Sequence, residues 1–214
     1  NFVHSIPQVS VSVALYDRER ALVGVVYDPL RDEMFTGVAG EGAKLNGHML
    51  AVSPESDLER SVVATGFPYD HDVHADELSV VVREVLRRVN GIRRFGSAAL
   101  DLAWVACGRI DGFWESDLNP WDWAAGSLLV LEAGGRWQCE PGPLGVEQTV
   151  AACPGVFDKL ARLVEVCDEL KIDLSEVAHV GDDLTDEAAL QTAIGEVRAE
   201  VDRWRALPNP LDWQ

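Results

Sequence analysis

The stretch NPWDWAAGSLLVLEAGG, residues 119–135, places an acid between two tryptophans at the predicted start of a helix. Asn119 suits the N-cap position, and Pro120 suits the first helical position, where its missing N–H is not needed. Asp122 then falls in the first turn, where an acid stabilises a helix by about 0.3–1 kcal/mol through the macrodipole. Taken alone, this position favours a helix-start acid over a metal ligand, so the surrounding sequence has to decide between the two.

The residues that follow Asp122 predict a closely packed helix. Ala124, Ala125 and Gly126 are small enough to let another backbone approach, and the apolar run then continues to the glycine pair at 134–135. A helix that is apolar on most sides belongs in the interior of a protein. We therefore expect this helix to be buried, with Asp122 at one end of it.

The composition limits the classes of protein and of partner. The chain has 214 residues, of which 47% are hydrophobic, which is enough for one large domain or two small ones. Its net charge of -18 argues against a general attraction to nucleic acid phosphates, although a local anion site stays open. No apolar run approaches the ~20 residues of a membrane span. We expect neither nucleic acid nor a membrane as a partner.

The four cysteines are widely spaced and form no CxxC or Cys/His cluster. This spacing indicates reduced thiols in a cytoplasmic protein and argues against a zinc site. We also expect a homodimer.

Residues 1–90 are predicted to form mostly antiparallel strands with one helix. Alternating apolar residues around a polar turn predict a hairpin. Apolar residues that recur at helical intervals up to an Asn-Gly pair predict a helix that ends there. The predicted elements are a hairpin at 8–29, strands at 33–36 and 60–67, and a helix at 76–89.

Residues 91–167 alternate strands and helices, which is an α/β layered pattern. The predicted strands are 92–96, 109–115, 135–139 and 149–152, and the predicted helices are 97–107, 119–133 and 155–167. Residues 168–214 form a separate acidic tail, with twelve acids against four bases, a predicted strand at 176–183 and a long predicted helix at 186–207.

Three polar features occur in the middle of the chain. Gly96, Ser97 and Ala98 open a predicted helix whose free N–H groups can face an anion or a hydroxyl. Glu115 ends a predicted strand and can reach a ligand at the sheet edge, and Asp122 starts the next helix. Each feature also has a purely structural interpretation, as a turn, a solvated acid or a helix-start acid. Together they are what the hydrolysis of a small polyol phosphate needs.

Residues 93–135, RRFGSAALDLAWVACGRIDGFWESDLNPWDWAAGSLLVLEAGG, resemble the second signature region of the inositol monophosphatase family, whose motif is WDxAAG. The stretches NFVHSIPQVSVSVAL (1–15), GVVYDPLRDEMFTGVAGEGAKLNG (24–47) and VVATGFPYD (62–70) fit the same family, so the resemblance covers residues 1–166. It implies an α/β fold, the layered α-β-α-β-α sandwich of the family, without its N-terminal elements.

Carried over residue by residue, the resemblance implies roles at five positions. Asp122 would be a carboxylate ligand to Mg2+, Glu115 would bind hydroxyls of the substrate, and Gly96, Ser97 and Ala98 would line the pocket with backbone groups. Family members use two or three Mg2+ ions to activate water for attack on a phosphate monoester. The resemblance thus implies a Mg2+-dependent phosphatase of small phosphorylated polyols or sugars.

The two tryptophans beside Asp122 are interpreted as its support. We expect Trp121 and Trp123 to pack on either side of the turn and to hold Asp122 in one rotamer, because metal ligands need such support.

The chain departs from the family at its start. It opens on Asn1 rather than Met and shows no signal peptide, which suggests a fragment. In the family, NFVH completes the motif DPxDGTxNFxH, whose two aspartates bind metal and whose threonine helps to activate water. An earlier glutamate ligand is also absent, so no water-activating residue is assigned and Asp122 is the only matched metal ligand. We expect an impaired enzyme; the alternative is a non-catalytic remnant or interaction module.

The tail contains a second phosphatase-like motif. VAHVGDDLTDEAAL, residues 177–190, resembles the GDDxxDE motif of haloacid dehalogenase-type phosphatases, in which Asp182 or Asp183 and Asp186 would hold Mg2+. The alternative is a helix start capped by Thr185. No stretch supplies the nucleophilic DxDx[TV] pattern, since the nearest, 69–74, belongs to the GFPYD turn. A separate dehalogenase-type site is therefore the weaker alternative.

Overall fold

The structure, a computed structural model, describes residues 1–17, 20–142 and 144–165. The chain divides into two units, Asn1–Glu169 and Leu170–Gln214, and all of the described residues belong to the first. The predicted tail strand and helix lie outside the described residues, as does the GDDxxDE motif with Asp182, Asp183 and Asp186. No helix within the described ranges is long and apolar enough to cross a membrane.

The first sheet is an antiparallel meander in which each strand pairs with the next along the chain. The predicted hairpin is confirmed, with Val13 paired to Val25 across it. The strands, in spatial order, are β1 (Val11–Asp17), β2 (Arg20–Asp28), β3 (Glu33–Val38), β4 (Gly42–Leu45) and β5 (His48–Met49).

The second sheet is mixed. Its second strand β6 runs parallel to both of its neighbours, β7 and β8, whereas β10 pairs antiparallel with β8 and β9. β6 comes from the first ninety residues, so the sheets do not divide the chain at residue 90, and the proposed halves 1–90 and 91–167 stay a prediction. In spatial order the strands are β7 (Gly91–Arg93), β6 (Val62–Thr65), β8 (Gly112–Ser116), β10 (Glu147–Ala152) and β9 (Arg136–Pro141).

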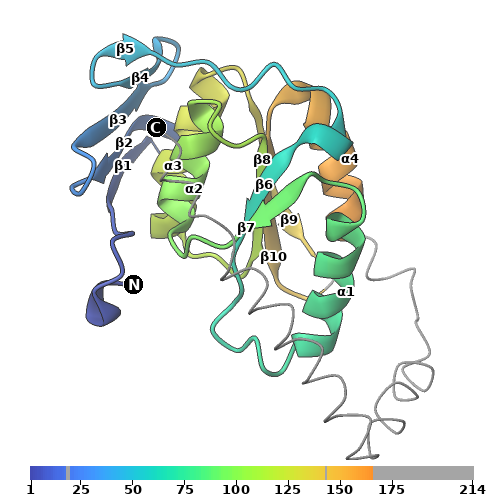
Figure 1. Ribbon diagram of the computed structural model, residues 1–214. Coiled ribbons are helices and arrows are strands. Elements are labelled where there is room, and N and C mark those ends of the chain that lie inside the picture. The colour runs from blue at the N-terminus through green and yellow to red at the C-terminus, as the bar shows by residue number, and fades with distance from the viewer. Residues whose placement is uncertain (18–19, 143, 166–214) are drawn as a thin grey trace, which may run out of the picture. The chain divides into compact units, whose positions relative to one another are not determined.

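Helices occupy the space between the sheets and the far face of the second sheet (Figure 1). The helices α2 (Ala98–Ala106) and α3 (Pro120–Glu132) lie between the two sheets, and α1 (Ala75–Leu86) and α4 (Pro154–Glu165) cover the far face. The layers are therefore sheet, helices, sheet, helices. This order confirms the predicted α-β-α-β-α sandwich without its first helical layer.

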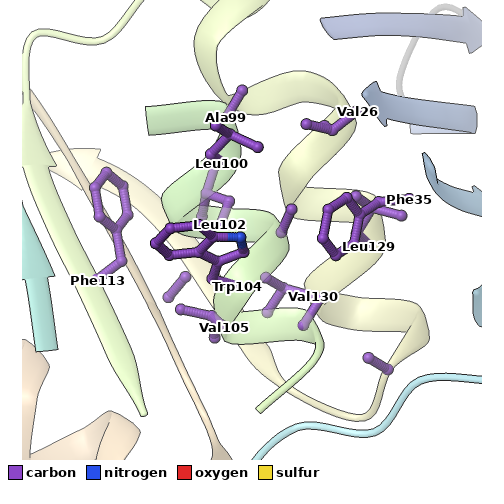
Figure 2. Packing of buried hydrophobic residues seen from close by; sticks show 14 of the residues in the cluster. Val26, Phe35, Ala99, Leu100, Leu102, Trp104, Val105, Phe113, Leu129 and Val130 are labelled. Atoms are coloured by element: carbon purple, nitrogen blue, oxygen red, sulfur yellow. The ribbon is translucent and has the colours of Figure 1, made fainter. Parts of the chain in front are cut away.

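The main core lies between the first sheet and the second, around α2 (Figure 2). Every residue of α2 after Ala98 is buried, which fits its apolar sequence. The predicted close approach at the small residues of α3 is confirmed: a Cβ at Gly24 of β2 would lie 2.8 Å from the Ala125 carbonyl oxygen, and one at Gly126 would overlap Leu102. Small residues thus let α3 pack tightly against both the first sheet and α2.

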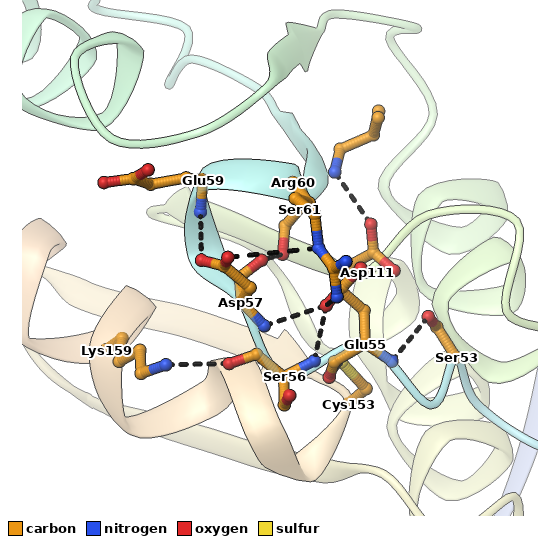
Figure 3. Close-up of polar contacts among 11 residues, drawn as sticks. Ser53, Glu55, Ser56, Asp57, Glu59, Arg60, Ser61, Asp111, Cys153 and Lys159 are labelled. Atoms are coloured by element: carbon orange, nitrogen blue, oxygen red, sulfur yellow. Dashed lines mark hydrogen bonds and ion pairs between the residues drawn. The ribbon is translucent and has the colours of Figure 1, made fainter.

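Residues 53–61 belong to the segment that connects the first sheet to the second along the chain. Hydrogen bonds among the polar groups of this loop stabilise it (Figure 3). Glu55 Oε1 accepts hydrogen bonds from the backbone N–H groups of Ser56 (2.8 Å) and Asp57 (2.9 Å) and from Arg60 (2.8 Å). These donors hold the pKa of Glu55 down at about 2. Lys159 of α4 donates to the Ser56 carbonyl at 2.7 Å, so the loop is tied to the far helical layer.

Candidate active site

The start of α3 has the geometry that its sequence predicts. Asn119 is the N-cap, Pro120 is the first helical residue, and the Asn119 N–H donates to Asp122 Oδ2 at 3.0 Å. Burial raises the pKa of Asp122, and the hydrogen bond from Asn119 opposes that rise. Asp122 therefore does serve the helix start, and that bond uses one of its two carboxylate oxygens.

The two tryptophans beside Asp122 do not flank it as expected. Trp123 packs on Trp137, with ring centroids 5.2 Å apart, and on Tyr16, at 6.4 Å. Trp121 is 68% exposed. Positions two apart on a helix point about 200° away from each other, so only one of the two rings can face the core. The expectation that both rings support Asp122 is wrong for Trp121.

The start of α2 is fixed by residues from the N-terminal segment. Gly96 has a φ of +81°, in the left-handed region that favours glycine, and Ser97 is the N-cap of the helix. The Asn1 side-chain amide donates to the carbonyls of Phe95 and Gly96, both at 3.0 Å, and to that of Gln8 at 2.9 Å. These hydrogen bonds of Asn1 stabilise the turn that precedes Ser97 and the first amides of α2.

Glu115 lies on β8, against the backbone of the loop that follows β6. A Cβ at Gly66 would overlap the carboxyl carbon and both oxygens of Glu115, well inside the 3.0 Å that real Cβ contacts respect. Burial raises the pKa of Glu115 to about 7, and the Arg94 guanidinium opposes that rise. The side chain is therefore confined, and little is available nearby to stabilise its charge.

A cavity of about 880 Å³ brings the predicted residues together. Its walls come from β1, the loop after β6, the start of α2, the end of β8 and the start of α3. All five predicted site residues line it, namely Gly96, Ser97, Ala98, Glu115 and Asp122. The structure thus brings these five residues together around one cavity, and the role of each stays a prediction.

Asp101 is a feature of this region that the sequence reasoning missed. It lies in the first turn of α2 and is 1% exposed, and its Oδ1 atom has no hydrogen-bond partner within the described part of the chain. Burial and, to a smaller extent, the Glu115 charge raise the pKa of Asp101 to about 8, although the Arg94 charge opposes the rise. The signal was present in GSAALDLAWVA, where one acid interrupts a run that is otherwise apolar and so must be buried.

The described residues supply only part of a metal site. Asp122 is a carboxylate at the mouth of a cavity, which suits Mg2+, a cation that takes oxygen ligands and is held by one or two carboxylates, water and phosphate oxygens. Among the residues that the structure describes, however, no group of three or more His, Cys, Asp or Glu side chains could hold a metal ion. These residues alone do not complete a magnesium site, and no chemical step is routed through one.

Comparisons with known proteins agree with this geometry. The sequence profile of the inositol monophosphatase family matches residues 1–167. The Nus factor SuhB of Escherichia coli (strain K12) is 49% identical over 135 residues, and the inositol-1-monophosphatase of Mesorhizobium japonicum is 47% identical over 135 residues. Each match covers 63% of this chain and 51% of the relative, so the chain spans about half the length of these relatives.

A solved structure shows the same arrangement of elements. The inositol monophosphatase of Anabaena (Nostoc) superposes with a TM-score of 0.71 and 40% sequence identity, over 76% of this chain and 66% of that one. The sequence match over residues 1–167 and the layered fold lead to one conclusion: the chain belongs to the inositol monophosphatase family.

Proposed function

We propose that the protein is a Mg2+-dependent phosphatase of small polyol or sugar phosphate monoesters. Membership of the family supports a phosphoric monoester hydrolase. The observation that carries the finer proposal is the cavity in which Glu115, Asp122 and the start of α2 converge. Its volume of about 880 Å³ lies within the range of roughly 300–1,000 Å³ that is typical of small-molecule sites.

Each side chain has a distinct part in this proposal. Asp122 would offer one carboxylate oxygen to Mg2+, which when bound neutralises phosphate charge and activates water. Glu115, which lines the cavity, would accept hydrogen bonds from substrate hydroxyls. Gly96, Ser97 and Ala98 would present backbone groups to the substrate at the N-terminus of α2, where unpaired N–H groups favour polar and anionic partners.

We expect the 214-residue chain by itself to be a very poor phosphatase, because Asp122 is the one metal ligand matched to the family. With inositol 1-phosphate and millimolar Mg2+, purified chain should release phosphate near the background rate. A version extended at its N-terminus with the corresponding segment of a family member should gain Mg2+-dependent hydrolysis.

Two results would contradict the proposal. If the unextended chain turned over within about tenfold of a complete family member, a different set of residues would have to hold the metal, and Asp182, Asp183 and Asp186 of the tail would be the next to test. If the extended version folded and bound Mg2+ but hydrolysed no polyol or sugar phosphate, the substrate class would be wrong.

A second candidate is a non-catalytic interaction module. Relatives that are 48–49% identical to this chain carry the name Nus factor SuhB rather than that of an enzyme. The net charge of -18 disfavours a general attraction to nucleic acid phosphates, so we favour a protein partner in that case. Retention of a stable fold without phosphate release in the extended version, together with absent RNA binding at low salt, would support this candidate.

The remaining expectations belong to the same proposal. We expect a homodimer, which the mass in solution would test, and a cytoplasmic location, which the free thiols of Cys107, Cys139 and Cys153 support.

A further inference from the structure

Gly66 stands beside Glu115 because of the register of two parallel strands. In the β6–β8 pair, Val63 lies opposite Gly112, and Thr65 lies opposite Trp114. One residue further along both strands, Gly66 comes beside Glu115. Registered partners in parallel strands direct their side chains to the same face of the sheet, so positions 66 and 115 compete for one volume.

The Glu115 carboxyl group occupies the space that a side chain at position 66 would fill. A Cβ built on Gly66 meets all three carboxyl atoms of Glu115, and no other group lies among its three nearest neighbours. The backbone at Gly66 does not have a positive φ. An alanine would thus be compatible with the backbone there, and the space taken by Glu115 is the physical reason for a glycine.

Buried and charged groups surround this part of the sheet end. The charge of Glu115 acts on Asp101, which is buried in the first turn of α2, and the Arg94 charge acts on both carboxyl groups. Phe67, next to Gly66, packs against the Arg94 guanidinium at 5.4 Å. Since Glu115 also lines the cavity, a carboxyl group displaced from Gly66 has the cavity to move into.

We propose that Gly66 is a positioning residue that sets how far the Glu115 carboxyl group reaches into the cavity. The space that remains in the cavity would then limit the size of the polyol that can bind next to Glu115. The part of this inference that concerns the substrate rests on the proposed function, whereas the steric contact between Gly66 and Glu115 does not. Glycine leaves the carboxyl group low against the sheet edge, so a ring with several hydroxyls can enter. A side chain at position 66 would push the same carboxyl group into the volume that the ring needs.

The steric part can be tested on the chain as it exists by a double-mutant cycle followed by thermal unfolding. Gly66→Ala should lower the melting temperature by about 3–10 °C, the range expected for overpacking in a chain of this size. In a Glu115→Ala background the same change should cost almost nothing. In a Glu115→Gln background the full loss should remain, because glutamine has the same shape as glutamate; this matched control separates sterics from charge.

The effect of Gly66 on the choice of substrate is measured by steady-state kinetics of the version extended at its N-terminus. Gly66→Ala should raise KM for inositol 1-phosphate about tenfold more than KM for the smaller glycerol 2-phosphate, with kcat changed much less. Adding Glu115→Asp, which shortens the acid by one methylene, should restore part of the lost preference for the ring.

The outcomes distinguish this inference from the proposed function. Equal losses from Gly66→Ala in the Glu115→Ala and Glu115→Gln backgrounds, or KM values for the two substrates that rise together, would overturn it. If the extended version hydrolyses no phosphate ester while the cycle shows coupling to Glu115→Ala alone, the proposed function fails and Gly66 still positions Glu115.

Discussion

Two groups of acidic side chains in this fold have opposite surroundings. In the loop group, Glu55 and Asp57 accept hydrogen bonds from the backbone of their own loop, and Asp111 accepts one from Val62 N–H at 2.7 Å (Figure 3). The second group, called the cavity group because Glu115 lines the cavity, consists of Asp101 and Glu115. Asp101 is buried and its Oδ1 atom has no partner among the described residues, and Glu115 is confined against Gly66. The same residue types therefore serve structure in one place and remain free for chemistry in the other.

The pKa values follow from this difference. Donors hold the pKa of Glu55 at about 2, whereas burial raises that of Glu115 to about 7 and that of Asp101 to about 8. Buried polar groups in folded proteins are normally paired, so carboxyl groups left without donors at a cavity mark a candidate site. The comparison gives the candidate site a physical basis that is independent of family resemblance.

The largest expected effect is at Asp122. In the extended version, Asp122→Asn should lower kcat/KM more than about 100-fold, because loss of even an outer partner of a metal ligand costs 10–100-fold. Asparagine keeps an oxygen that can accept from the Asn119 N–H, so the helix start should survive. Phosphate release and circular dichroism measure the two properties.

The matched control for Asp122 is Asp57, whose side chain accepts from the Glu59 N–H at 3.1 Å at the start of a 3-10 helix (Leu58–Arg60). Asp57→Asn should leave phosphate release unchanged. Near-normal turnover in Asp122→Asn would mean that Asp122 is only a helix-start acid, like its control.

A smaller effect is expected at Glu115. A hydrogen bond to a charged group contributes about 1.5–3 kcal/mol, so Glu115→Gln in the extended version should raise KM for a polyol phosphate at least tenfold. Because the partner is a hydroxyl rather than the reacting phosphate, kcat should change by less than about threefold. Steady-state kinetics checks this split, with Glu55→Gln as a control; a fall in kcat at constant KM would assign Glu115 a different role.

The cavity group should also make stability depend on pH above the acidic range. Asp101 and Glu115 bind protons more tightly in the folded chain than in the unfolded one, where carboxyl groups have pKa values near 4. Stability should therefore fall as pH rises from about 4 to about 8. Between pH 5.5 and 8 we expect a loss of about 3–5 kcal/mol in the free energy of unfolding.

Urea unfolding of the chain at these two pH values measures that loss. Asp101→Asn removes the more deeply buried acid and should remove most of the pH dependence. A free energy of unfolding that is flat or rises from pH 5.5 to 8 would show that these carboxyl groups have found partners.

The smallest effect is expected at Glu55 and has the opposite sign. Because donors lower the pKa of Glu55 to about 2, its contribution to stability is present above its ordinary pKa and is lost as pH falls from about 4.5 to 2. Glu55→Gln should flatten the acid side of the stability curve while the side above pH 5 keeps its slope. Loss of the slope above pH 5 in this variant would remove the distinction between the two groups.

The sequence alone predicted the features that depend on residues close together in the chain. Asn119 and Pro120 defined the start of α3, and the small residues at 124–126 predicted a close backbone approach, which Gly24 provides. The layered fold followed from the alternation of strands and helices, together with the family resemblance. The five predicted site residues share one cavity.

Contacts between distant segments set the rest. The pattern of residues 60–67 predicted a strand but not that it would pair in parallel with β7 and β8. Gly66 became significant only once that register placed it beside Glu115. Trp121 looked like a packing residue, yet it points away from the core because helical geometry allows only one of two alternate rings to face inward.

The contrast between the two groups of acids is most directly tested by carboxyl carbon NMR of the chain across a pH series, with signals assigned through Asp101→Asn, Glu115→Gln and Glu55→Gln. The account predicts two apparent pKa values from the coupled cavity pair, near 7 and near 8, and a pKa near 2 for Glu55. Cavity carboxyl groups that both titrate near pH 4, as in unfolded peptides, would contradict it.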